Sequence, residues 1–313
     1  MDQNSKVYIA GRGMVGSALL RRLEDAGYRN IVAPMSKELD LRNQSEVKCF
    51  FRQEQPDYVF LTAAKVGSVQ ANIESPLDFL YDNAMIVLNV MRAASVSSVR
   101  RLMLIASTAV YPRDASQPVS ESSLLTGAFE PSNEAYALAK TVGVKYCQYS
   151  SLHDPGKFIA VTPSNIYGPG DKYGARIAHV VPAMIRRFHE AKLAGVNSVT
   201  VWGSGKQVRE FLYVDDVAEA CLLLMDKHEG CGPVNISPGT PTTIAQLAVA
   251  VARTVGFSGD IHYDASKPEG AACRTSSIAT LRSYGWHPSV SLEEGLGRTY
   301  TDYLSTMKQQ SIQ

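Results

Sequence analysis

The amino-acid sequence predicts an α/β fold in which a doubly wound parallel sheet is joined to a smaller C-terminal substrate-binding lobe. From Lys6 onward, short apolar runs alternate with helical stretches at a spacing of roughly 25 to 30 residues, which is typical of βαβ units. The 313 residues exceed one typical domain of roughly 100 to 150 residues. Apolar residues make up 45% of the chain and charged residues 19%, a balance that indicates a well-buried core.

The first expected element is a strand over residues 7–11 (VYIAG), followed directly by an amphipathic helix over residues 14–26 that ends before Gly27. Later strands are expected where apolar runs recur, at 30–34, 57–64, 101–108 and 157–168. These runs are apolar on both faces, so helices should cover both sides of the sheet.

After about Pro169 the strict alternation is lost. A helical run over 181–195 precedes a mixed stretch over 199–220, and the tail after about Met307 is expected to be unstructured. The sequence therefore predicts a main sheet domain over residues 1–168. Residues 169–313 should form mainly the smaller lobe, with some returns to the main sheet.

Composition excludes several function classes. Lys and Arg total 31 against 30 acidic residues, so the net charge of +1 gives no footprint for nucleic acid. No apolar run approaches the length of about 20 residues that spans a bilayer, and no apolar signal segment opens the chain. The scattered cysteines favour a reducing compartment, and we expect a cytoplasmic protein; they are Cys49, Cys147, Cys221, Cys231 and Cys273.

A metal site is not expected. His179, His189 and His287 do not form a ligand spacing with nearby carboxylates. Asp215 and Asp216 precede a helical run, where they are better explained as stabilising the start of that helix.

A glycine-rich motif follows the first strand and opens the first helix. In this context, a G-x-G-x-x-G motif lets backbone N–H groups approach the pyrophosphate of a dinucleotide, which indicates a Rossmann-type domain. A tight turn without a ligand is the alternative, but strand, motif and helix agree. The motif comprises Gly11, Arg12, Gly13, Met14, Val15 and Gly16.

The end of the second strand carries no carboxylate to hold the ribose hydroxyls of NAD. That region reads Val-Ala-Pro-Met over residues 32–35 and continues with Ser36 and Lys37. Arg12 and Lys37 could both face a 2′-phosphate, so the sequence favours NADPH. The alternative is that both cations are ordinary surface residues, which for Lys37 taken alone is the better interpretation.

A reducing centre is indicated by Tyr136 and Lys140, which share one helix face because they are four residues apart. The ammonium is expected to lower the pKa of the phenol, which suits Tyr136 to donate a proton to a carbonyl oxygen as hydride arrives. Ser107 ends a buried strand at the carboxyl edge of the sheet and can hydrogen-bond the same oxygen.

The chain resembles an extended short-chain dehydrogenase/reductase and, within that superfamily, the GDP-L-fucose synthase family. The resemblance covers nearly the whole chain and rests on the blocks AGRGMVGSAL, FLTAAKVGSVQAN, ASTAVYP, EPSNEAYALAK, TPSNIYGP, HVVPAMIRRFHEA, VWGSGKQVREFLYVDD and DASKPEG. It implies an NADPH-dependent enzyme that acts on a GDP-4-keto-6-deoxy sugar and pairs as a homodimer through two helices of each subunit.

The resemblance also assigns roles to matching residues. Ser107, Tyr136 and Lys140 would form the reducing triad, and His179 would move protons on the sugar ring and border the cofactor. Further cofactor contacts would be Ser36, Lys37, Asp40, Leu41, Ala63, Pro163, Ser164, Asn165 and Ile166. Substrate contacts beyond the triad would be Thr108, Asn133, Asn165, Val180, Arg187, Trp202 and Arg209.

One departure from that family matters for the chemistry. Fucose synthases carry a cysteine two residues after the catalytic serine, where this chain has Ala109. An alanine methyl can neither give nor take a proton, so inversion at C3 and C5 should be lost while reduction at C4 remains. Smaller departures occur at Ala272, Cys273, Arg274 and Ser277, and the glycine loop is one residue shorter.

We therefore expect a GDP-4-keto-6-deoxy sugar 4-reductase without 3,5-epimerisation. Its substrate would be the GDP-linked D-lyxo-heptose of capsule or O-antigen biosynthesis more readily than a hexose. A bifunctional GDP-L-fucose synthase is the alternative, with Thr108 or water replacing the thiol. A sugar-nucleotide 4,6-dehydratase is disfavoured, because this chain lacks the acidic pair that normally follows the Ser/Thr of this strand in such enzymes. A catalytically silent sugar-nucleotide-binding protein is also disfavoured, because it would not need the intact triad.

Overall fold

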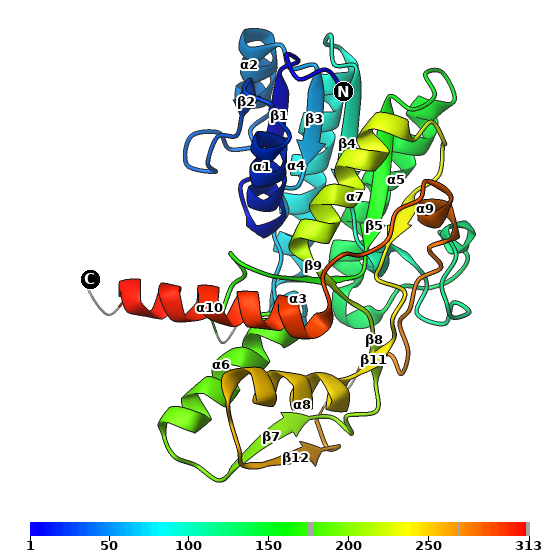
Figure 1. Ribbon diagram of the computed structural model, residues 1–313. Coiled ribbons are helices and arrows are strands. Elements are labelled where there is room, and N and C mark those ends of the chain that lie inside the picture. The colour runs from blue at the N-terminus through cyan, green and yellow to red at the C-terminus, as the bar shows by residue number, and fades with distance from the viewer. Residues whose placement is uncertain (175–177, 268–269, 311–313) are drawn as a thin grey trace.

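A computed structural model describes residues 1–174, 178–267 and 270–310. Its larger lobe contains a six-stranded parallel sheet in the order β10-β5-β4-β3-β1-β2 (Figure 1). The α/β fold with a central parallel sheet is thus confirmed. The strands are β1 (Val7–Ala10), β2 (Ile31–Val32), β3 (Tyr58–Leu61), β4 (Arg101–Ile105), β5 (Phe158–Pro163) and β10 (Val234–Ile236).

Helices cover both faces of this sheet, as the doubly apolar strands predict. Tyr8 and Ala10 point into a core shared with α2 (Gln44–Glu54), α4 (Pro76–Ser95) and α5 (Glu134–Ser151). Val7 and Ile9 point into the opposite core, which is shared with α1 (Met14–Asp25), α7 (Val214–Lys227) and α9 (Ala279–Ser283). The two faces alternate along β1 because successive side chains of a strand point in opposite directions.

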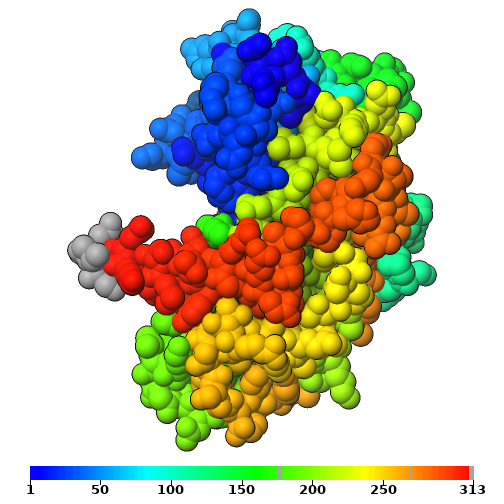
Figure 2. Space-filling view, in the orientation of Figure 1, coloured from blue at the N-terminus to red at the C-terminus, as the bar shows by residue number. Residues whose placement is uncertain are grey.

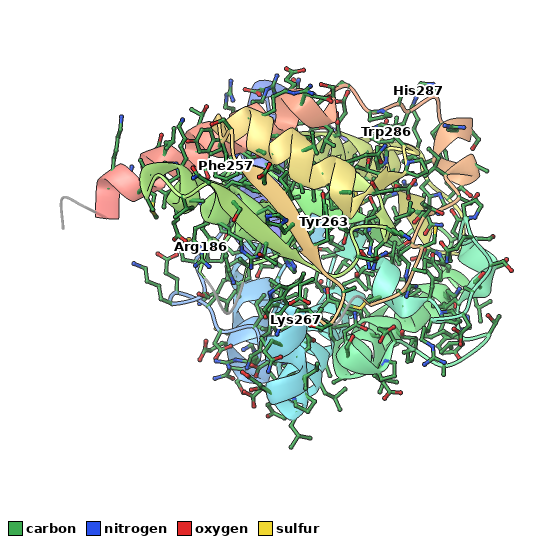
Figure 3. The ribbon with its side chains drawn as sticks, turned by 90° about the horizontal axis from the view of Figure 1, so that it is seen from below. Arg186, Phe257, Tyr263, Lys267, Trp286 and His287 are labelled. Atoms are coloured by element: carbon green, nitrogen blue, oxygen red, sulfur yellow. The ribbon has the colours of Figure 1, made fainter. Side chains whose placement is uncertain are left out.

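The smaller lobe is built around α6 (Val180–Leu193), α8 (Ile244–Val255) and α10 (Leu292–Gln310). Strands β7 (Ser198–Trp202) and β12 (Asp260–Asp264) pair in parallel at its base, side by side in Figure 3. Strand β8 (Val208–Arg209) pairs antiparallel with β11 (Thr242–Thr243). The apolar core of this lobe includes Phe188 and Phe257, whose ring centroids lie 5.4 Å apart.

The structure corrects two expectations about element boundaries. The run expected as one strand over 157–168 is divided, because β6 (Asn165–Tyr167) leaves the main sheet and pairs with β9 (Phe211–Tyr213). Helix α10 extends to Gln310, so the expectation of an unstructured tail after Met307 is wrong for residues 308–310. The reason is that Tyr303 and Met307 pack against the core of the smaller lobe and hold the last turns of the helix.

Some elements beyond residue 169 belong to the larger lobe. Strand β10 extends the parallel sheet, and α7 packs in the same core as α1. Asp216, in the first turn of α7, accepts hydrogen bonds from the backbone of Ser289 and Val290 at 3.0 and 3.2 Å. This carboxylate therefore ties a later loop to the start of α7.

Helix α5 approaches β4 closely because of one glycine. A Cβ atom on Gly143 would lie 2.5 Å from Leu104 Cδ2 and 2.8 Å from Val87 Cγ1, both in the packed core. Real Cβ atoms do not approach other atoms that closely, so a side chain at residue 143 would force Leu104 and Val87 to shift within the packed core. Tyr136 and Lys140 lie on this same helix.

We expect Gly143→Ala to destabilise the protein relative to Gly297→Ala by about 1–3 kcal/mol, since extra methyl groups overpack a dense core. Gly297 lies in α10, and a Cβ atom on it would meet nothing within 4 Å, so alanine there should stabilise the helix by about 1 kcal/mol. Paired thermal and urea unfolding curves check this. Equal shifts for the two variants would contradict the close α5–β4 contact.

Candidate active site

One cavity of about 1210 Å³ lies at the carboxyl edge of the parallel sheet and is lined by residues of both lobes. Open α/β sheets bind their ligands at this edge. All the site residues predicted from the sequence line this cavity, including those of the glycine loop, the Ser-Tyr-Lys set and the expected substrate contacts. Pro268 and Glu269 of the DASKPEG block lie outside the described residues.

Two glycines of the glycine loop, Gly11 and Gly16, are packed so tightly that a side chain would not fit at either position. Gly11 has a φ of 116°, and a Cβ there would lie 2.5 Å from the backbone N of Ala63. A Cβ on Gly16 would lie 1.9 Å from Gly11 O. Helix α1 begins at Met14 with no side-chain capping bond, so its first N–H groups remain available to an anion. The loop fits the pyrophosphate of a dinucleotide.

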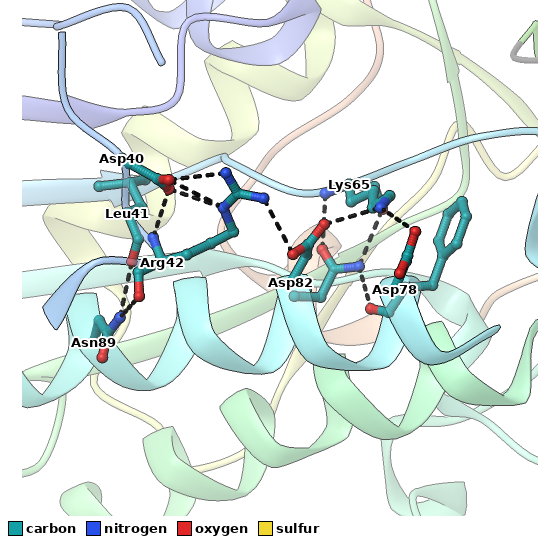
Figure 4. A network of polar contacts seen from close by, with 9 residues as sticks. Asp40, Leu41, Arg42, Lys65, Asp78, Asp82 and Asn89 are labelled. Carbon is teal, nitrogen blue, oxygen red and sulfur yellow. Dashed lines mark hydrogen bonds and ion pairs between the residues drawn. The ribbon is translucent and has the colours of Figure 1, made fainter. Parts of the chain in front are cut away.

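A chain of ion pairs borders the cavity beyond the glycine loop (Figure 4). Arg42 binds Asp40 with two nitrogens, at 2.9 Å from Nε and 2.8 Å from Nη2, and reaches Asp82 at 3.3 Å. Lys65 Nζ lies 2.9 Å from Asp82 and 3.1 Å from Asp78. Hydrogen bonding to Arg42 holds the pKa of Asp40 below its usual value, so this carboxylate stays charged.

This chain of ion pairs leaves two other cations for a phosphate. Arg42 and Lys65 are neutralised by their carboxylate partners. Arg12 and Lys37 line the same cavity, are exposed, and have no ion-pair partner within the described residues. A 2′-phosphate could therefore form ion pairs with Arg12 and Lys37.

The Ser-Tyr-Lys set is held by β4 and α5. Ser107 follows β4, and its Oγ accepts a hydrogen bond from Ala109 N at 3.2 Å and is hydrogen-bonded to Tyr136. Lys140 is 1% exposed, and its Nζ donates to Ile105 O at 2.9 Å. The same ammonium lies 5.9 Å from the centre of the Tyr136 ring. These contacts bring the hydroxyl, the phenol and the ammonium to one place.

The pKa of Tyr136 differs from the expectation. Burial raises it above its ordinary value, and the hydrogen bond to Ser107 lowers it by less. The expected lowering by the ammonium is wrong, because removal from water disfavours the phenolate more than the hydrogen bond to Ser107 favours it. Burial also lowers the pKa of Lys140 to about 8. Tyr136 therefore keeps its proton at neutral pH.

Two further titratable groups lie in the cavity. His179 directly precedes α6 and faces the open cavity, where desolvation and the charge of Lys172 lower the pKa of its imidazole. Burial raises the pKa of Asp171 to about 6. Its Oδ2 is buried without a hydrogen-bond partner among the described residues. Ala109, which also lines the cavity, adds no group that can carry a proton.

The end of the cavity nearer the smaller lobe gathers guanidinium groups. Burial lowers the pKa of both Arg209 and Arg274, and the charge of Arg274 adds to the effect on Arg209. Neither has a salt bridge within the described part of the chain, so an anionic ligand would satisfy both. Arg187 on α6 donates to Thr200 O at 2.7 Å, and Trp202 exposes 57% of its surface.

Arg274 was missed as a site residue by the sequence reasoning. It was noted only as a departure from the family pattern, and its neighbours Ala272 and Cys273 carry no charge. The backbone of Arg274 bonds to Val208, and this pairing brings it beside Arg209. The proximity of the two arginines follows only from this backbone pairing in the folded chain, because they are far apart in sequence.

Neither a metal centre nor a membrane span is found over residues 1–174, 178–267 and 270–310. No group of three His, Cys, Asp or Glu side chains in these ranges could hold a metal ion. No helix there combines the length and apolar character needed to cross a bilayer.

His189, which was considered from the sequence as a metal ligand, lies on α6. Its Nδ1 is hydrogen-bonded to Tyr300 Oη at 2.9 Å.

Comparison with protein families decides the classification. The model of the NAD dependent epimerase/dehydratase family matches residues 7–237. This chain belongs to that family. The match spans β1 to β10 and therefore includes the glycine loop and the Ser-Tyr-Lys set of this family member.

Similar proteins of known name extend over nearly the whole chain. A curated relative, GDP-L-fucose synthase 1 of Arabidopsis thaliana, is 45% identical over 98% of this chain and 95% of its own. A GDP-6-OMe-4-keto-L-xylo-heptose reductase from C. jejuni has a TM-score of 0.90 and 31% identity, covering 98% and 99% of the two chains. A GDP-D-glycero-L-gluco-heptose synthase from Campylobacter jejuni, solved in the presence of NADPH, has a TM-score of 0.87 and 31% identity, covering 97% and 99%.

We expect carbonyl reduction by this site to fall as pH rises through about 8. Lys140, whose pKa lies near that value, loses the positive charge that supports a phenolate forming at Tyr136. A pH profile of kcat at saturating substrate measures this. Lys140→Arg keeps its charge at alkaline pH, so its weaker activity should not decline near pH 8. An identical decline in both proteins would show that another group titrates.

Proposed function

We propose that this protein uses NADPH to reduce the C4 keto group of a GDP-4-keto-6-deoxy sugar without 3,5-epimerisation. The observation that carries the proposal is Ala109, which lies in the cavity two residues after Ser107 and has no titratable group. The relatives named GDP-L-fucose synthase and GDP-heptose reductase support a GDP-linked keto sugar as the substrate class. The structure solved with NADPH, together with Arg12 and Lys37, supports the coenzyme.

Bound NADPH would supply hydride to C4, and residues of this chain would hydrogen-bond and protonate the carbonyl oxygen. Ser107 donates a hydrogen bond to this oxygen, and Tyr136 transfers its proton to it. The ammonium of Lys140 stabilises the phenolate that remains. Burial keeps the proton on Tyr136 until charge develops on the oxygen, because the phenolate alone is disfavoured in this site.

Inversion at C3 or C5 would need two proton carriers on opposite faces of the ring. Deprotonation next to a carbonyl takes a proton from one face, and inversion returns a proton to the other. His179 can serve one face, since its pKa lies below its ordinary value and its imidazole is neutral at pH 7. Ala109 can serve neither, so reduction proceeds on the unepimerised sugar.

The sugar nucleotide would bind across both lobes. Arg209 and Arg274 would hold the diphosphate, because two partly buried guanidiniums that form no salt bridge within the described residues suit two phosphates. Trp202 offers an open aromatic face for guanine, and Arg187 lies on the adjoining helix α6. Asn133 lies directly before α5, three residues from Tyr136, where it would contact the sugar.

We favour a heptose over a hexose as the sugar, for capsule or O-antigen biosynthesis. The support is the likeness to two Campylobacter heptose enzymes over nearly the whole chain, at TM-scores of 0.90 and 0.87. The departures from the family pattern at Ala272 and Cys273 directly precede Arg274, which lines the cavity, and this agrees with a changed sugar.

A bifunctional GDP-L-fucose synthase is the second candidate. Asp171 favours it, because this carboxyl has a pKa of about 6 and lies in the same cavity as His179. A carboxyl that titrates near neutral pH could act as the second proton carrier in place of a thiol. The identity to plant GDP-L-fucose synthase also agrees with this alternative.

A homodimer is proposed through α4 and α5. These neighbouring helices expose large apolar side chains, with Leu77 79% and Tyr81 63% exposed on α4. On α5, Tyr149 is 60% exposed and Leu152, which follows the helix, is 72% exposed. Apolar surface of this kind is favourable to bury against a second copy of the chain.

Turnover of GDP-4-keto-6-deoxymannose with NADPH in D₂O tests the proposed function. We expect NADPH oxidation and a product in which C3 and C5 keep their original configuration by NMR, because His179 alone serves only one face of the ring. The corresponding heptose substrate should give a higher kcat/KM. Deuterium at C3 and C5 with inverted configuration would establish the bifunctional alternative, and the absence of any NADPH oxidation would leave a binding protein.

Ala109→Cys provides the matched gain-of-function control. A thiol at this position is expected to invert C3 or C5 and to leave solvent deuterium at the inverted centre, because it supplies the proton carrier that the methyl lacks. Adding His179→Asn to Ala109→Cys should remove that inversion again while leaving the 4-reduction measurable.

A further inference from the structure

The segment over residues 168–173, here named the strap, joins β6 to the chain that leads into α6. Gly168 and Gly170 have φ values of 152° and 83°, a region that other residues rarely adopt. Three of its residues, Gly170, Asp171 and Lys172, line the cavity. The strap therefore follows a backbone path that its glycines permit, along the wall of the site.

The strap meets the glycine loop at the start of α1. A Cβ atom on Gly170 would lie 3.8 Å from Met14 Cα, so the two backbones are in near contact. Met14 is the first residue of α1, whose free N–H groups face the position of a dinucleotide pyrophosphate. Lys172 adds a positive charge to this part of the cavity and has no ion-pair partner within the described residues.

The strap is held from outside by the C-terminal helix. Asp302 Oδ2 accepts a hydrogen bond from Gly170 N at 3.0 Å and lies 3.4 Å from Tyr173 Oη. Tyr173 also donates to Thr299 O at 3.1 Å, and its ring centre lies 4.7 Å from that of Tyr303. Helix α10, which carries these partners, runs across the molecule between the two lobes (Figure 1 and Figure 2).

We propose that Asp302 is a positioning residue for NADPH: it fixes the strap against the glycine loop so that the strap covers the bound pyrophosphate. The proposal rests on NADPH as the cofactor of the proposed function. It gives α10 a role in cofactor retention, because the helix provides the acceptor for Gly170 N. Among the described residues, this is the bond that ties the glycine of the strap nearest α1 to another element.

The hydrogen-bond acceptor of Asp302, and not its charge, is what the proposal requires. A negative charge near a pyrophosphate repels it, so an electrostatic effect alone would weaken NADPH binding. Loss of the acceptor frees Gly170 N and loosens the strap, which also weakens binding. Asp302→Asn and Asp302→Ala separate the two effects, because asparagine keeps an acceptor oxygen and removes the charge.

The test measures NADPH affinity by fluorescence titration and NADP release by stopped flow, with no sugar substrate present. Asp302→Ala is expected to raise the NADPH Kd about tenfold, the scale of a lost hydrogen bond to a charged group, and to speed release. Asp302→Asn should bind NADPH at least as tightly as the parent protein. Thr301→Ala, an exposed neighbour on α10 whose hydroxyl bonds only within the helix at Gly297 O, should leave the NADPH Kd unchanged.

Kinetics then separate positioning from general stability. In Asp302→Ala, the KM for NADPH should rise while kcat at saturating NADPH and the KM for the GDP-sugar stay within about twofold. An NADPH Kd equal to that of Thr301→Ala, or tighter than that of the parent protein, would overturn the proposal. Weak NADPH binding in Asp302→Asn as well as in Asp302→Ala would also overturn it, because the retained acceptor would then be irrelevant.

A second measurement needs no variant. Hydrogen exchange of the strap peptide in the parent protein should slow when NADPH is added, because the strap then lies over the pyrophosphate. Unchanged exchange of this peptide at saturating NADPH would contradict the proposal. Both measurements use NADPH alone, so failure of the sugar reduction would appear separately, as normal NADPH binding without turnover.

Discussion

The hydrogen bond from the buried Lys140 ammonium to Ile105 O joins the two elements on which the site depends. It connects α5 to the end of β4, and Gly143 lets the helix lie close enough for the bond to form. An ammonium buried in an apolar region is costly unless a carbonyl or a charge satisfies it. Satisfying it here brings Tyr136 beside Ser107, so the constraint that stabilises this contact also forms the proposed reducing centre.

The sequence predicted the parallel-sheet fold and singled out residues that line one cavity, because local signals were strong. The glycine loop, the Tyr-Lys spacing and the apolar strands each have a physical meaning within a few residues. The departure of β6 from the main sheet was not predictable, because it depends on pairing with β9 far along the chain. The direction of the pKa shift of Tyr136 was predicted wrongly for a related reason. The shift depends mainly on how deeply the phenol is buried, and tertiary packing sets that burial.

The cavity separates two kinds of chemistry. In the proposed reduction, Tyr136, Ser107 and Lys140 would form a connected set around the carbonyl oxygen. Ring inversion would need two proton carriers, and this chain has His179 in the cavity but Ala109 two residues after Ser107. Charge is divided as well: carboxylates neutralise Arg42 and Lys65 at one end, while Arg209 and Arg274 remain unpaired among the described residues at the other.

The protonation state of Tyr136 in the NADPH complex tests this account most directly. The chain has 15 tyrosines, and ¹³Cζ labelling with a Tyr136→Phe reference spectrum identifies the signal of this one. We expect the Tyr136 signal to stay at the chemical shift of a neutral phenol from pH 6 to pH 9, because burial disfavours the phenolate. A titration step near pH 7 would show that Tyr136 loses its proton at neutral pH and would contradict its role as a protonated donor.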